Sequence, residues 1–271
     1  MHYTEILPSV HLRESIKCFW TLEQTNINHS PAPEPVLPDG RMELIFNLAD
    51  SFKRYHFDGT AEIQPTTLVV GQTLRSTTIE PLGKINLFGV RFQTAGAQVF
   101  FDFSLNELTD KIENLPSVLG AKGKQIEDQI IHSISTQNRI ALIEKLIIEK
   151  MRSKNRFDEA IAHAAKIIET TNGLISVEKL SKAVGVGSRQ LERKFQKHIG
   201  ISPKSLCRIN RIQTVLNVMK SKQIESWADL TMDFGYFDQA HFIRDFKSFT
   251  GKTPMVYLAD NNQLTDIFTG L

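Results

Sequence analysis

The chain has 271 residues, of which 41% are hydrophobic and 23% charged, and its formal net charge is +2. A single hydrophobic core rarely grows beyond about 250 residues, so this length favours two globular domains. The composition excludes a disordered or fibrous protein. No apolar run reaches about 18 residues and no signal sequence follows Met1, which predicts a cytoplasmic protein without a membrane segment.

The sequence gives little support for a metal or catalytic site. The two cysteines, Cys18 and Cys207, lie far apart and predict neither a disulfide nor a metal cluster. The N-terminal histidines form no His-x-His pair. The chain also lacks a Ser-His-Asp order, a phosphate-binding glycine loop and a dinucleotide-binding motif. We therefore predict no metal, no cofactor and no enzymatic activity.

Residues 1–110 contain short runs of β-forming residues. Strands are predicted at residues 43–48, 67–71 and 86–92, and turn sequences such as Pro38-Asp39-Gly40 and Asp58-Gly59 bound the β-forming runs. Many short strands at this spacing indicate a barrel or a sandwich.

Residues 111–155 have a helical period and predict a connector between two domains. One apolar stripe consists of Ile126, Ile130 and Ile134, and the other consists of Ile140, Ile143, Ile147 and Met151. Because the β domain needs only one stripe for packing, the other is predicted to pair with a second subunit in a homodimer.

Residues 156–258 show almost no strand pattern, which predicts an all-helical domain. A first amphipathic helix ends near Gly173, and its apolar stripe consists of Phe157, Ala160, Ile161, Ala164, Ile167 and Ile168. Residues 156–271 hold sixteen Lys or Arg and twelve acids, whereas residues 1–155 hold sixteen and eighteen. Nine of these basic residues and one acid lie within residues 188–222. Such an excess suits a phosphate backbone, although a solvated helix face is an equally good interpretation.

Two short helices are predicted between Ser176 and Gly200, with Gly185 in the turn between them. Ser176 is the predicted cap of the first helix, whose buried stripe is Leu180, Ala183 and Val184. The second helix is predicted at residues 188–198, with Leu191, Phe195 and Ile199 buried and Arg189, Gln190, Arg193, Lys194 and Lys197 outside.

A second copy of this pattern follows at residues 226–251. Ser226 is the predicted cap, Ala228, Leu230 and Phe234 supply apolar contacts, and Gly235 forms the turn. The next helix begins at Asp238 and buries Phe242, Phe246 and Phe249, which leaves Gln239, Arg244 and Lys247 outside. Between the copies, Ser202-Pro203 starts a long helix through Leu206, Ile209, Ile212, Leu216 and Met219, which predicts a rigid connector.

These residues resemble the AraC/XylS family of bacterial transcription regulators over about 100 residues. The matching segments are Gly185-Val186, Leu191-Glu192-Arg193-Lys194-Phe195, Gly200-Ile201-Ser202-Pro203, Arg211-Ile212, Gly235-Tyr236, Phe242-Ile243-Arg244-Asp245-Phe246-Lys247, Gly251-Lys252-Thr253-Pro254 and Tyr257. Three positions depart from the family pattern: Gly187 replaces a capping serine, Thr231 an alanine and Leu258 an arginine. The resemblance implies a sequence-specific, DNA-binding transcription regulator.

The N-terminal half resembles a cupin-like sensor domain that precedes this DNA-binding domain in part of the family. The resemblance rests on Leu37-Pro38-Asp39-Gly40, Glu43-Leu44-Ile45-Phe46, Gly89-Val90-Arg91-Phe92, Gly96-Ala97 and Glu107-Leu108-Thr109-Asp110. The predicted protein is therefore a two-domain α+β protein. A mostly β cupin-like barrel (residues 1–110) and a helical connector (111–155) precede an all-α double helix-turn-helix domain of seven helices (156–258) and a tail (259–271).

The second helix of a helix-turn-helix unit places its exposed N-terminal half in the major groove of double-stranded DNA, where Arg suits guanine and Gln suits adenine. The predicted DNA-binding residues are Arg189, Gln190, Arg193, Lys194 and Lys197 in the first unit, Gln239, His241, Arg244 and Lys247 in the second, and Arg208 on the connector helix. For Arg211, an internal ion pair is as good an interpretation as a phosphate contact.

Arg41, Glu43 and Arg91 are the candidate ligand-binding residues of the β domain, although charges beside a strand are usually solvated. The expected partners are DNA, a small-molecule effector, RNA polymerase and a second copy of the chain. Two alternatives remain open. A barrel enzyme or metal binder fused to a DNA-binding domain would hold a transition metal tightly, and an architectural DNA protein would not distinguish its cognate site from random DNA.

Overall fold

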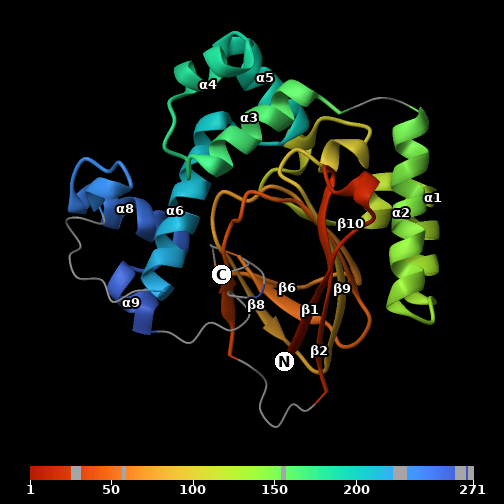
Figure 1. The fold of residues 1–271 in the computed structure, drawn as a ribbon. Helices are drawn as coiled ribbons and strands as arrows, with labels where there is room; N and C mark the ends of the chain where they lie inside the picture. Colours follow the sequence, from red (N-terminus) through yellow and green to blue (C-terminus); the bar gives the residue numbers. More distant parts are fainter. Residues whose placement is uncertain (26–31, 57–58, 154–156, 222–230, 260–266, 268–271) are drawn as a thin grey trace.

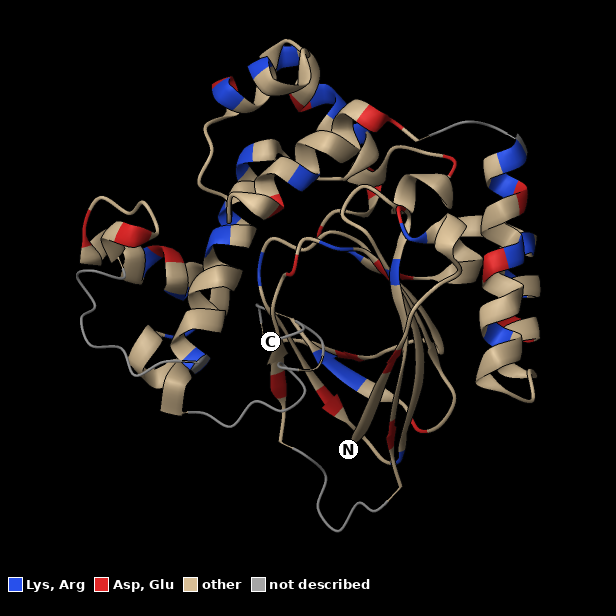
Figure 2. Cartoon of the chain, in the orientation of Figure 1, with Lys and Arg blue, Asp and Glu red and all other residues tan. Residues whose placement is uncertain are grey.

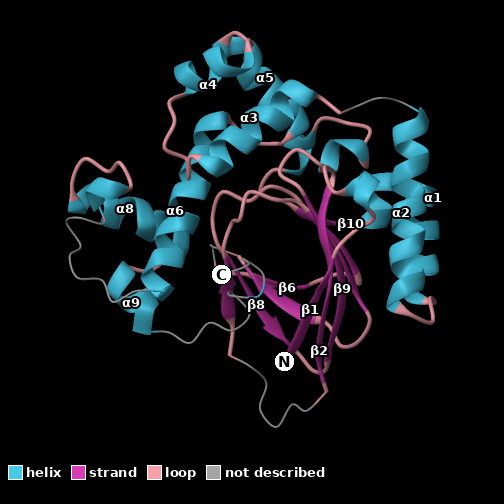
Figure 3. Ribbon diagram, viewed as in Figure 1, coloured by secondary structure: helices cyan, strands magenta, loops and turns pink. Residues whose placement is uncertain are grey.

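In the computed structural model, the chain forms a β domain, two helices that follow it and a helical domain (Figure 1). The structure describes all residues except 26–31, 57–58, 154–156, 222–230, 260–266 and 268–271. Figure 3 shows the two helices after the sheets on one side of the β domain and the helical domain around its upper end and its opposite side. The predicted α+β architecture is confirmed.

The β domain consists of two antiparallel sheets. The larger sheet has the order β1 (His2–Ile6), β2 (Ile16–Gln24), β9 (Ile85–Phe92), β4 (Glu43–Asn47), β7 (Thr67–Val70) and β10 (Ile112–Asn114). The smaller sheet has the order β3 (Glu34–Val36), β8 (Thr77–Pro81), β5 (Phe52–Tyr55) and β6 (Ala61–Ile63). The three predicted strands are confirmed as β4, β7 and β9. Beyond residue 110, β10 still belongs to the large sheet because it pairs with β7.

The two faces of the large sheet bury different cores, as the alternation of side chains along a strand requires. On β9, Leu87 lies between the sheets with Trp20 and Ile79, whereas Phe88 and Val90 face the helices that follow the sheets. Glycine is required at position 89, because a Cβ atom there would lie 1.9 Å from Cε2 of Trp20. The indole of Trp20 therefore packs directly on the backbone of β9.

Both connector stripes are buried within one chain. Ile126 and Ile130 of α1 (Leu115–Ile131) and Ile143 and Ile147 of α2 (Thr136–Ser153) belong to one core with the β domain. The inference that one stripe stays free for a second subunit is therefore wrong. Ile134 is 95% exposed because it follows the end of α1, so its assignment to the first stripe is also wrong.

The helical domain has one apolar core, to which helices from both halves of the domain contribute. Its helices are α3 (Glu159–Thr170), α4 (Val177–Val184), α5 (Ser188–His198), α6 (Pro203–Ser221), α8 (Gln239–Thr250) and α9 (Pro254–Ala259). Phe157 precedes α3 and packs against the core of the β domain and connector instead, so its place in the α3 stripe was wrong. The predicted cap Ser226 and the apolar residues Ala228 and Leu230 lie outside the described residues.

Candidate nucleic-acid interface and the cavity between the sheets

The helices α4 and α5 form the first helix-turn-helix unit. Ser176 caps α4 as predicted, because its side chain accepts a hydrogen bond of 3.2 Å from the amide of Lys179. The helix ends at Gly185, whose φ of +65° allows the tight turn into α5. Ser181 donates to the carbonyl of Val186 at 2.6 Å and is buried, whereas Ala183 is exposed. The prediction that Ala183 is buried is therefore wrong. Ser181 is buried instead, and its hydrogen bond stabilises the turn.

The first recognition helix, α5, spans the predicted residues. Leu191 and Phe195 are buried, as is Ile199 just after the helix end, and Arg189, Gln190, Arg193 and Lys197 are exposed. Figure 2 shows basic residues on these helices at the upper end of the molecule. A line of exposed donors on an otherwise anchored helix is suited to contact the edges of bases.

Lys194 differs from its neighbours on α5, because its side chain is half-buried rather than outside as predicted. Its Nζ atom lies 2.6 Å from Oδ2 of Asp158, which caps α3 and also accepts from the amide of Ile161. Burial alone would raise the pKa of Asp158, but the hydrogen bonds from Lys194 and Ile161 and the charges of Lys194 and His198 lower it. The position of Lys194 is therefore explained by packing within the domain.

The second recognition helix, α8, is capped and anchored as predicted. Gly235 has a φ of +68°, and the side chain of Asp238 accepts a hydrogen bond of 2.6 Å from the amide of His241. The rings of Phe242, Phe246 and Phe249 are fully buried. The residues exposed on this helix include all four predicted DNA contacts, Gln239, His241, Arg244 and Lys247.

The long helix α6 holds α8 in place. Arg208 of α6 donates through Nε to Oδ1 of Asp245 at 2.6 Å and also bonds Ser248, and its guanidinium lies 5.9 Å from the ring centre of Phe249. Tyr236 donates to the other oxygen of Asp245 at 3.0 Å. Arg208 is therefore engaged between two helices of its own domain, and its contact with phosphate stays a prediction.

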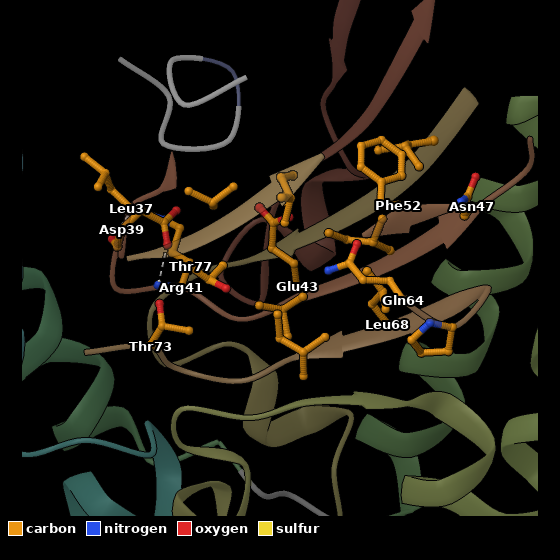
Figure 4. A pocket seen from close by; sticks show the side chains of 17 residues that line it. Leu37, Asp39, Arg41, Glu43, Asn47, Phe52, Gln64, Leu68, Thr73 and Thr77 are labelled. Carbon is orange, nitrogen blue, oxygen red and sulfur yellow. Dashed lines mark hydrogen bonds between the residues drawn. The ribbon is translucent and has the colours of Figure 1, made fainter. Parts of the chain in front are cut away.

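A cavity lies between the two sheets of the β domain. Its volume is about 80 Å³, measured as the space open to the centres of water-sized molecules, and its walls are mostly apolar, with Ile45, Phe52, Leu68 and Ile79 among them. Figure 4 shows Asp39, Arg41 and Thr73 at one end and Asn47 and Gln64 at the other. Apolar walls with a few polar groups are typical of a site for a small organic molecule.

Of the three predicted pocket residues, Arg41 and Glu43 line the cavity and Arg91 does not. Arg91 is buried to 1% exposure beside Glu43, with which it forms a charged hydrogen bond, and its Nη1 atom lies 3.6 Å from Glu5. Burial raises the pKa of Glu43, and the charge of Arg91 opposes this effect. The positive charge of Arg91 thus compensates the negative charge of the Glu43 carboxylate, and Arg91 itself does not line the cavity.

The charged end of the cavity is joined to the helical domain. Nη2 of Arg41 lies 3.2 Å from Oε1 of Glu169 in the last turn of α3, and Thr94 donates to the same oxygen at 2.7 Å. Nε of Arg41 is buried without a partner among the described residues. A carboxylate at the C-terminal end of a helix is disfavoured by the helix dipole, and Glu169 is stabilised there by these two residues of the β domain and by Lys166, whose Nζ lies 3.7 Å from its other oxygen.

Comparison with known proteins gives two family matches. Residues 4–114 match a family described only as a domain of unknown function, and residues 180–260 match a helix-turn-helix domain. A transcriptional regulator of the helix-turn-helix type from Haemophilus influenzae is 27% identical over 141 residues, which are 52% of this chain and 45% of that protein. The XylDLEGF operon transcriptional activator of Pseudomonas putida is 26% identical over 30% of this chain and 26% of its own length. Residues 180–260 therefore carry a helix-turn-helix domain.

Solved structures are also similar to this chain. ToxT from Vibrio cholerae aligns over 89% of this chain and 97% of its own, with 11% identity and a TM-score of 0.46. A probable AraC family regulator from Rhodopseudomonas palustris aligns over 37% of this chain and 95% of its own, with 25% identity and a TM-score of 0.34. The chain spans less than half the length of the curated relatives that it matches.

Reasoning from the sequence alone missed three functional candidates. Glu169 and Thr94 were not singled out, because Glu169 lies 128 residues from Arg41 and 75 residues from Thr94 in the sequence, and no local pattern indicates these contacts. Phe237 was also missed, although a phenylalanine directly before a predicted helix cap is a visible signal. Among the described residues, no group of three His, Cys, Asp or Glu is arranged to hold a metal ion. No described helix is long and apolar enough to cross a membrane.

Proposed function

We propose that this protein is a transcription regulator that recognises a specific DNA sequence with α5 and α8. The observation that carries the proposal is a pair of helices, each fixed by buried phenylalanine and each with exposed arginine on its outer face. Arg193 and Arg244 are the side chains expected to contact guanine, with Arg189 and Gln239 as further base contacts. Because α6 lies between the units, the two helices are expected to enter successive major grooves.

Selection of bound sequences from a random DNA pool tests this function. The full chain should enrich one motif with two blocks of preferred bases about 10 base pairs apart. Binding without enrichment would favour an architectural DNA protein. The absence of any DNA binding would contradict the proposal.

The proposed regulator responds to a small molecule held between the two sheets. Support comes from the apolar walls and from the charged end formed by Asp39, Arg41 and Glu43. These features fit an organic molecule with an apolar body and a polar group that faces Arg41. Replacement of Leu68, a wall residue at 7% exposure, by Trp should fill the cavity, and Ile63→Trp at an exposed position is the matched control. Only Leu68→Trp should abolish the effect of cell-extract metabolites on DNA binding.

The coupling between the cavity and the DNA-binding domain is proposed to run through Arg41. Its guanidinium lines the cavity and also bonds Glu169 of α3. A ligand that attracts Arg41 into the cavity weakens this bond, and the position of α3 on the β domain then changes. Because α3 packs in one core with α4, α5 and α6, such a change reaches the first recognition helix.

Two further partners belong to the proposal. A transcription regulator of this kind is expected to act on RNA polymerase. A homodimer is also expected, but since both connector stripes are buried, its interface would have to use exposed positions such as Ile134 and Met151, which are 95% and 39% exposed. Sedimentation at micromolar concentration, with and without DNA, measures the assembly state, and a monomer under both conditions would contradict the dimer.

A further inference from the structure

Phe237 has a far larger exposed fraction than any other phenylalanine that the structure describes. The chain has 17 phenylalanines, and within the described part of the chain only Phe237 falls among the exposed large hydrophobic residues, at 92% exposure. An isolated apolar side chain on a surface needs no explanation by itself. The position of Phe237 does need an explanation, because this residue directly precedes Asp238, the cap of the second recognition helix.

The local geometry explains why the ring of Phe237 stays outside. An apolar residue before a helix cap usually packs against the fourth residue of the helix, which for α8 is Phe242. Here Tyr236 takes that place, since its ring centre lies 5.3 Å from that of Phe242. The corresponding residue of the first unit, Val186, does pack against the domain core that contains Leu191. The two units thus differ at this position, and only the second has an exposed aromatic ring.

The surroundings of Phe237 favour nucleic acid over another protein as its partner. The exposed face of the adjacent helix carries Gln239, His241, Arg244 and Lys247. Of the three acids nearest in sequence, two are already occupied, because Asp238 caps the helix and Asp245 is bonded by Arg208 and Tyr236, whereas Asp233 is exposed before the turn. The apolar ring therefore stands at the edge of a hydrogen-bonding, cationic surface. In the major groove, the apolar group beside such polar base edges is the 5-methyl group of thymine.

We propose that Phe237 is a specificity-determining residue whose ring packs on a thymine methyl group at the edge of the base pairs contacted by α8. This inference rests on the proposed function. It adds a preference for thymine at one position of the second half of the site, for which the first half has no counterpart because Val186 is not available.

Thymine-to-deoxyuridine exchange tests the contact, since it removes the methyl group and leaves base pairing intact. Duplexes of the selected site are prepared with one thymine replaced at a time. The wild-type chain should lose about fourfold in affinity at one position of the α8 half, the factor expected for burial of one methyl group at 1.4 kcal/mol per tenfold. Phe237→Ala should bind the thymine duplex more weakly and should be insensitive to the exchange at that position. Phe237→Leu should keep part of the sensitivity.

Met255→Ala is the matched control, because Met255 is 67% exposed in the same domain but lies on α9. It should keep the full fourfold effect. All variants should unfold at the wild-type temperature, since both positions are exposed.

Equal methyl effects in wild type and Phe237→Ala at every position would overturn the inference while the proposed function stands. The same holds if Phe237→Ala weakens the binding of thymine and deoxyuridine duplexes equally, which would assign the ring to a DNA contact that does not involve the methyl group. A wild-type chain that does not prefer the selected site to a scrambled duplex would instead refute the proposed function, and the inference with it.

Discussion

Arg41 and Glu169 lie 3.2 Å apart and join the charged end of the β-domain cavity to the last turn of the first helix of the DNA-binding domain. The pair is partly buried, with 18% and 21% of the two side chains exposed. The same guanidinium that would meet a ligand thus also positions α3.

Glu169→Gln should weaken the domain junction with a small loss of stability. The amide keeps an acceptor for Thr94 but loses the charge that faces Arg41, so we expect about 1 kcal/mol less stability. The larger effect should be on regulation, because DNA affinity should no longer depend on cell-extract metabolites. DNA titrations with and without the extract measure this dependence.

Glu178→Gln is the matched control for Glu169→Gln. It removes a helical ion pair of 2.7 Å with Lys182, and both partners are about three-quarters exposed and distant from the β domain. This control should keep both stability and the response to metabolites. An unchanged response in Glu169→Gln would exclude the pair as the coupling element.

Asp158→Asn should destabilise the protein in a pH-dependent manner. Asparagine still caps α3, so the change isolates the charge interaction with Lys194. The folded-state pKa of Asp158 lies below its ordinary value, so its stabilising effect is present above the unfolded pKa of about 4 and disappears as pH falls through the folded pKa. Urea unfolding should show a difference of about 1 kcal/mol at pH 7 that shrinks below about pH 4. A difference independent of pH would contradict the charge interpretation.

Arg208→Met should act on stability and not on DNA phosphate contacts. The change leaves the half-buried carboxylate of Asp245 with a hydrogen bond from Tyr236 but without its charged partner, and we expect a loss of about 1 to 3 kcal/mol of stability in thermal unfolding. The slope of DNA affinity against salt should stay as in wild type. Lys247→Met, at an exposed position of α8, should show the reverse, with normal stability and a slope lower by about one. If Arg208→Met kept full stability but lowered the slope of DNA affinity against salt, Arg208 would contact phosphate.

The helical domain could be predicted closely because its signals are local. Ser176, Gly185 and the spacing of Leu191 and Phe195 define the first unit, and α5 has the predicted bounds. The prediction of Ala183 as buried failed because the hydrogen bond from Ser181 to the turn determines which side of α4 faces inward. A helical period alone does not contain this information.

Features that depend on contacts between distant segments could not be predicted in the same way. The strand β10 is three residues long and exists because it pairs with β7, forty-odd residues earlier in the chain. Likewise, Arg41 and Arg91 were equivalent candidates for a ligand, and only the register that places Arg91 opposite Glu43 assigns Arg91 to an internal ion pair. The cavity residues Leu68 and Ile79 come from different sheets, so no single segment reveals the pocket.

Competition binding of Arg193→Ala and Arg244→Ala across all single-base variants of the selected site tests the central claim most directly. Each change should cost about 1 to 3 kcal/mol on the selected site and relax the base preference at one or two positions, in different halves of the site. Lys197→Ala, run in parallel at several salt concentrations, should weaken all sequences equally and lower the salt slope by about one. If both arginine variants kept the wild-type base preference and changed only the salt dependence, α5 and α8 would not be the recognition helices.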